Sequence, residues 1–98
     1  MNLESLNMSA DIQSNSVTIS NEEGLHARPA SLFAHLANQF HSQISVTRGE
    51  ESVDGKSILS ILTLGATQGV QLIIRAEGLD ADQAVQQLSQ LVESGFDV

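Results

Sequence analysis

Two apolar periodicities alternate along the chain, and this alternation limits the possible folds more than any other feature. Segments in which every second residue is apolar predict strands with one buried face. They are separated by segments with apolar residues at every third or fourth position, which predict amphipathic helices. The resulting element order is βαββαβα. The predicted strands lie at 16–20, at 43–47, around Val53 and at 70–77, and the predicted helices at 29–40, 57–62 and 81–92.

The predicted sheet has an apolar face on one side only, because each strand alternates apolar with polar residues. This favours an antiparallel sheet with the helices layered on one face. The expected class is α+β: an open-faced sandwich of a four-stranded antiparallel sheet with three helices on one face. Residues 1–14 are polar without sustained periodicity. We expect them to form a mobile N-terminal extension to a single domain spanning 15–98.

Several residues predict where the helices begin and end. Ser57 precedes an apolar run and has the residue type preferred at a helix N-cap. Asp80 with Gln83 resembles a capping box at the start of the last helix. Gly95 follows the last periodic residue and is expected to end that helix.

The composition excludes several classes of function. The net charge is −8, with only four Lys and Arg residues, which argues against binding to nucleic acids or anionic membranes. There is no cysteine, so disulfides, thiol catalysis and cysteine-bound metals are excluded. No apolar run approaches the length of a membrane span, and the N-terminus lacks the features of a signal peptide. We expect a cytoplasmic protein without membrane insertion.

The segment 24–30, with the sequence GLHARPA, carries the strongest chemical signal. His26 lies just ahead of Pro29, and proline is favoured in the first turn of a helix, where its missing N–H costs nothing. The helix should therefore begin within a residue or two of His26, with its free N–H groups and positive dipole end near the imidazole. Arg28 adds a guanidinium. The sequence predicts an anion site around a nucleophilic ring nitrogen, suited to a phosphoryl group.

The sequence gives little support for a metal site or a catalytic triad. His35 and His41 are six residues apart, a spacing that suits no single helical face, and no third ligand accompanies them. We expect no bound metal and no cofactor. Nothing resembles a Ser-His-Asp arrangement.

Residues 17–98 resemble the HPr family, the histidine-containing phosphocarriers of the bacterial phosphotransferase system. Segment 24–30 is similar to the active-site signature of the family, and Gly55-Lys56-Ser57-Ile58-Leu59 to its regulatory-serine signature. The separation of His26 and Ser57, 57 − 26 = 31 residues, also agrees. The resemblance implies a sheet order of 1-4-2-3.

The resemblance also implies a function. His26 would accept, on Nδ1, a phosphoryl group that Enzyme I has obtained from phosphoenolpyruvate, and would pass it to a IIA domain in sugar uptake and its regulation. An attacking histidine must be neutral, and both Arg28 and a helix N-terminus disfavour the imidazolium form. The same groups would then hydrogen-bond the phosphoryl oxygens. Phosphoryl transfer depends mostly on positioning and charge neutralisation, so no general base is needed. The resemblance implies a phosphoryl carrier with a transient phosphohistidine rather than a stand-alone enzyme.

Ser57 has two interpretations that do not exclude each other. The helix cap explains the residue without any modification. The resemblance implies that an HPr kinase/phosphorylase phosphorylates this serine in some bacteria.

A docking surface around His26 is expected from two sets of residues. Polar residues of the first helix form a stripe beside its apolar stripe, and the short second helix carries more apolar residues than it can bury. The small number of lysines indicates that docking depends more on apolar contact than on charge. We expect a monomer. The predicted docking residues are Ala27, Ser31, Leu32, His35, Asn38, Lys56, Ile58, Leu59 and Leu62.

Two alternative functions stay open. The nitrogen-branch paralogue NPr is one, because residues 94–97 look like the tail of some of its members, whereas Lys56-Ser57 and Leu64-Gly65 look more like the sugar branch. A regulatory binding module that never carries phosphate is the other. His26 argues against it, because family members of that kind lack the histidine.

Overall fold

The structure, a computed structural model, describes residues 11–97. Its elements follow the predicted order βαββαβα. They are β1 (Ile12–Thr18), α1 (Ala27–Ala37), β2 (Gln43–Arg48), β3 (Glu51–Asp54), α2 (Ile58–Thr63), β4 (Gln71–Glu77) and α3 (Ala81–Glu93).

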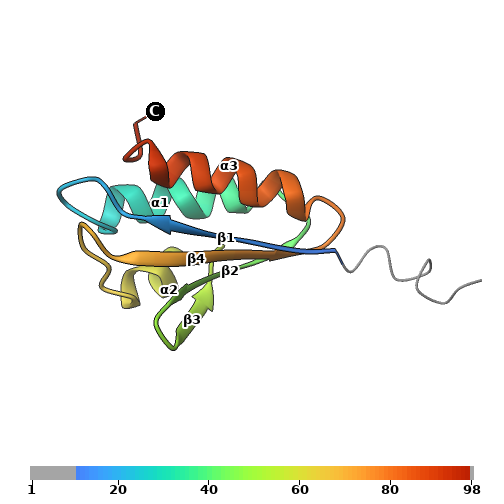
Figure 1. Cartoon of the computed structure of the whole chain (residues 1–98), viewed down its shortest axis with the longest axis horizontal. Helices are drawn as coiled ribbons and strands as arrows, with labels where there is room; N and C mark the ends of the chain where they lie inside the picture. Colours follow the sequence, from blue (N-terminus) through green and yellow to red (C-terminus); the bar gives the residue numbers. More distant parts are fainter. Residues whose placement is uncertain (1–10, 98) are drawn as a thin grey trace, which may run out of the picture.

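The four strands form one antiparallel sheet in the order β1-β4-β2-β3. Helices α1 and α3 run side by side over one face of this sheet (Figure 1). α3 packs against β1 and β4, while α2 packs against α1 and β3. The predicted α+β open-faced sandwich, with its 1-4-2-3 order, is confirmed.

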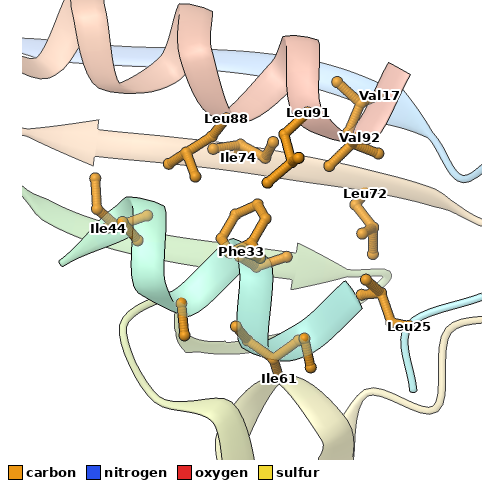
Figure 2. Packing of buried hydrophobic residues seen from close by; sticks show 14 of the residues in the cluster. Val17, Leu25, Phe33, Ile44, Ile61, Leu72, Ile74, Leu88, Leu91 and Val92 are labelled. Carbon is orange, nitrogen blue, oxygen red and sulfur yellow. The ribbon is translucent and has the colours of Figure 1, made fainter. Parts of the chain in front are cut away.

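The hydrophobic core lies between the sheet and the helices. In β4 the side chains of Leu72, Ile74 and Ala76 are buried, whereas the residues between them are exposed or half-buried. Phe33 of α1 points into the space between the helices and the sheet, near Leu91 of α3 (Figure 2). The alternation in the sequence therefore corresponds to the buried and open faces of the sheet, as predicted.

The first strand begins earlier than the sequence predicts. β1 starts at Ile12, which pairs with Glu77 at the far end of β4, so the expected boundary after residue 14 falls within the strand. The side chains of residues 12–16 are all exposed, and this stretch therefore has no apolar alternation to reveal it. The remainder of the expected extension, residues 1–10, lies outside the described residues.

The predicted capping box at Asp80 is wrong. Asp80 is the N-cap residue of α3, but its side chain makes no capping hydrogen bond. Its carboxylate instead accepts hydrogen bonds from the backbone N–H groups of His41 and Ser42, at 2.8 and 2.9 Å, and from the Ser42 hydroxyl. The Ser42 hydroxyl contributes most to lowering the pKa of this carboxyl to about 2. Asp80 thus ties the start of α3 to the loop before β2.

Within residues 11–97, none of the helices is both long enough and apolar enough to cross a membrane.

Candidate active site

His26 occupies the N-cap of α1, with an extended backbone and an exposed side chain. The carbonyl of His26 accepts the first helical hydrogen bond, from the N–H of Ala30 at 2.9 Å. Pro29 is the third helical residue, where its missing N–H costs no helical bond. The predicted helix start is confirmed. The N–H groups of Ala27 and Arg28 belong to the first turn, where no helical carbonyl is available to them.

The loop that carries His26 is held to the loop between α2 and β4, and both lie at the same end of the sheet (Figure 1). The N–H of Leu25 donates to the carbonyl of Ala66 at 2.9 Å. Gly24 has a φ of 71°, and a Cβ at this position would lie 2.6 Å from the Ala66 oxygen. A glycine is therefore required immediately before the segment that positions the histidine.

Two side chains of opposite charge accompany His26. Nε2 of His26 lies 3.6 Å from a carboxylate oxygen of Glu23, and both side chains are exposed, by 51% and 75%. Arg28 is also exposed, and its guanidinium makes no hydrogen bond or ion pair with any residue in 11–97. The guanidinium is thus available to an incoming anion.

Ser57 is the N-cap of α2, as predicted. Its hydroxyl oxygen accepts a hydrogen bond from the N–H of Ser60 at 3.2 Å, and the residue is half-buried.

The predicted docking residues fall into three groups. Ala27, Ser31 and His35 are exposed along α1, beside α2 with its exposed Ile58 and Leu59. Leu59 is the more prominent of the two apolar residues, at 76% exposed against 41% for Ile58. The half-buried Leu32 and Leu62 pack against the core.

Asn38 and Lys56, also predicted to dock partners, join the end of α1 to the turn before α2. The Asn38 side-chain amide donates to the carbonyls of Ala34 and Lys56, at 2.7 and 2.9 Å. The Lys56 ammonium donates to the carbonyl of Phe40 at 2.8 Å. The structure therefore gives both residues a role in holding α1 and α2 together.

Sequence reasoning missed Glu23 and Arg48. Glu23 precedes His26 by three residues, and this spacing was its only signal. The Arg48 guanidinium donates to the carbonyls of Leu64 and Gly65, at 2.8 and 2.9 Å, and so binds the C-terminal end of α2. No local sequence pattern predicts this contact, because it joins residues 16 positions apart.

The chain thus combines an open-faced α+β sandwich with an exposed histidine at the N-cap of its first helix. The family model described as the PTS HPr component phosphorylation site matches residues 13–94. The chain therefore belongs to the HPr family and is an HPr-type phosphocarrier of the phosphotransferase system.

Known proteins agree with this assignment. The chain is 42% identical to the phosphocarrier protein HPr of Pseudomonas aeruginosa, over 83% of its own length and 91% of that protein. The crystal structure of HPr-C-His from Thermoanaerobacter tengcongensis superposes with a TM-score of 0.84 at 42% identity, covering 88% of this chain and 97% of that one. The chain also matches the multiphosphoryl transfer protein of Haemophilus influenzae at 40% identity, but covers only 20% of that longer protein.

Proposed function

We propose that His26 is the phosphoryl acceptor of this phosphocarrier, that Enzyme I charges it with a group derived from phosphoenolpyruvate, and that a IIA domain receives the group. The observation that carries the proposal is the position of His26. Its exposed imidazole lies at the N-cap of α1, where the first-turn N–H groups have no helical partners. Such a terminus favours an anion.

The transfer is a displacement at phosphorus. The Nδ1 lone pair of His26 forms the new N–P bond while the bond from phosphorus to the donor breaks, and the donor keeps that electron pair. The Arg28 guanidinium and the N–H groups of the first turn neutralise charge on the phosphoryl oxygens. Donation to a IIA domain is the same step in reverse, which is why stabilisation of the phosphohistidine must stay modest.

Docking of both partners is proposed at the exposed side of α1 and α2. Leu59 and Ile58 offer apolar area next to the polar residues of α1. Only four Lys and Arg residues occur in a chain of net charge −8. Apolar contact therefore supplies most of the attraction to its partners. We further propose that the carrier acts as a cytoplasmic monomer.

Ser57 is the proposed regulatory site, for an HPr kinase/phosphorylase. A phosphate on its hydroxyl would lie at the N-terminus of α2, where the helix dipole tolerates negative charge. It would also lie directly beside Ile58 of the proposed docking surface.

The nitrogen-branch alternative has one specific observation in its favour, the tail at 94–97. Phe96 in this tail is buried against the core with a φ of 62°, so the tail is an integral part of the fold. Assays with each Enzyme I paralogue of the host distinguish the branches, because the cognate paralogue should charge the carrier much faster.

The proposal is tested by incubating the carrier with Enzyme I, magnesium and phosphoenolpyruvate. We expect one acid-labile phosphoryl group per chain. His26→Ala should abolish labelling, whereas His41→Ala, which removes an exposed histidine outside α1 and outside the proposed docking surface, should label normally. A His26→Ala variant that folds and still labels would overturn the assignment, and an unlabelled wild-type protein would favour the regulatory binding module.

A further inference from the structure

The carboxylate of Glu23 lies near Nε2 of the His26 ring. An oxygen of Glu23 is 3.6 Å from Nε2. We propose that Glu23 is a positioning residue that keeps the ring proton on Nε2 and thereby leaves the Nδ1 lone pair free to attack phosphorus. This inference rests on the proposed function of His26.

A neutral imidazole has two tautomers, and the position of Glu23 near Nε2 favours one of them. One ring nitrogen carries a proton and the other a lone pair, and neighbouring groups decide which is which. A carboxylate accepts hydrogen bonds and cannot donate them, so it favours the tautomer with the N–H toward it. A separation of 3.6 Å is longer than a hydrogen bond, and the influence is therefore electrostatic and sensitive to salt.

The same carboxylate has a role during transfer. When Nδ1 forms the N–P bond and the donor leaves with its electron pair, the ring that retains the Nε2 proton gains positive charge. Glu23 is placed to offset this charge, so no proton needs to leave the ring in the transfer step. A protonated ring is also the better leaving group when the phosphoryl group is passed on.

The backbone holds Glu23 and His26 in a fixed relation. The Asn21 side-chain amide donates to the carbonyl of Gly24 at 2.9 Å, and the N–H of Gly24 donates to the carbonyl of Asn21 at 3.2 Å. These bonds close the turn that contains Glu23. The N–H of Leu25 is bound to Ala66, as described above. The loop is therefore anchored on both sides of the carboxylate, although the carboxylate itself is exposed.

Glu22 provides a matched control. It is the adjacent residue, has the same side chain and is exposed, but it makes no ion pair with any residue of the described chain. A general effect of negative charge in this loop would respond equally to the loss of either carboxylate. A positioning role belongs to Glu23 alone.

The test uses the unphosphorylated full-length protein, with ¹⁵N-labelled histidine, and long-range ¹H–¹⁵N spectra that report the tautomer of each ring. In the wild type and in Glu22→Gln, we expect the neutral His26 ring to carry its proton on Nε2. In Glu23→Gln and Glu23→Ala, the ratio of the Nδ1–H to the Nε2–H form should rise about two- to fivefold, the range of an exposed ion pair. Raising the salt concentration should shift the wild type in the same direction.

A second readout follows the reaction. Glu23→Gln should lower kcat for phosphoryl transfer several-fold at an unchanged KM for Enzyme I, because docking residues are untouched. Identical tautomer ratios in the wild type and both Glu23 variants would overturn the inference. A change of the tautomer ratio in Glu22→Gln as large as that in Glu23→Gln would also overturn it. The tautomer ratios are measured without any phosphoryl donor. Failure of His26 to accept phosphate would therefore refute the proposed function, but the tautomer ratios would still decide the role of Glu23.

Discussion

His26 stands between a carboxylate three residues before it and a guanidinium two residues after it. Glu23 lies near Nε2, and Arg28 is exposed in the first turn of α1. In the proposed mechanism the Glu23 carboxylate acts on the ring, and the Arg28 guanidinium binds the phosphoryl group that the ring would carry. The reactive features therefore all lie within six consecutive residues, 23–28.

Replacement of Arg28 tests the cationic half of this site. Arg28→Ala removes a charged donor to the phosphoryl oxygens, worth about 1.5–3 kcal/mol, and should slow transfer about ten- to a hundredfold. Stopped-flow rates in both directions, with Enzyme I and with a IIA domain, measure the effect. Arg75→Ala removes an exposed arginine of β4 that pairs with Glu77, and should leave the rates unchanged. Equal rates for wild type and Arg28→Ala at sub-saturating partner would show that Arg28 is merely solvated.

At the scale of elements, α2 begins at Ser57, which is both the N-cap of the helix and the proposed site of regulatory phosphorylation. Ser57→Asp places a negative charge beside Ile58 while keeping a residue type that caps helices well. Affinity for Enzyme I, measured by titration calorimetry, should fall, while thermal stability stays near that of the wild type. Ser57→Asn is the matched control, since asparagine caps equally well without charge. Equal affinities for all three proteins would leave Ser57 as a cap only.

The link between α3 and the α1–β2 loop predicts a pH dependence. The pKa of Asp80 is lowered from 3.8 to about 2 in the folded protein, chiefly by the Ser42 hydroxyl. Folding therefore favours the carboxylate, and its contribution is fully present above about pH 4 and is lost as the pH falls toward about 2. The contribution is on the order of 1 kcal/mol, because water reaches this half-buried group.

Urea unfolding of Asp80→Asn across this range provides the measurement. The wild type should be more stable than the variant near pH 5, and the difference should shrink as the pH is lowered. Asp82→Asn changes an exposed carboxylate in the first turn of the same helix, and serves as the control. A stability difference that stays constant down to about pH 2 would contradict the role assigned to Asp80.

Sequence patterns predicted those elements whose signal is local. Strand alternation in 70–77 located β4, and Ser57 was predicted as a cap because its partner is only three residues away. Asp80 was misread because its hydrogen-bond partner Ser42 lies 38 residues distant, which no local pattern encodes. The first half of β1 was missed because the exposed side chains of residues 12–16 give the strand no apolar face.

For the candidate site, the sequence supplied His26 and its helix, but not the geometry around the ring. The position of His26 three residues before Pro29 predicted an imidazole at a helix N-terminus. The approach of Glu23 to the ring depends on the conformation of the turn at 21–24, which brings the carboxylate back toward Nε2. Side-chain placement of that kind follows from backbone conformation rather than from residue type.

The whole molecule is organised so that its reactive end is separate from its stabilising core. Apolar side chains of β1, β2 and β4 pack beneath α1 and α3. The loops before α1 and after α2 meet at one end of the sheet, where His26 is exposed (Figure 1). The exposed position of His26 suits the proposed role, in which the phosphoryl group is presented to its partners.

The most direct test of this account is a pair of ¹⁵N and ³¹P spectra of the histidine-labelled protein, taken before and after transfer from Enzyme I. The chain has three histidines, and each ring gives its own signals. We predict that one phosphorus signal appears, that only the His26 ring shifts, with the change at Nδ1, and that the shift reverses when a IIA domain is added. A phosphorylated protein with an unchanged His26 ring, or with the phosphoryl group on His35 or His41, would contradict the account.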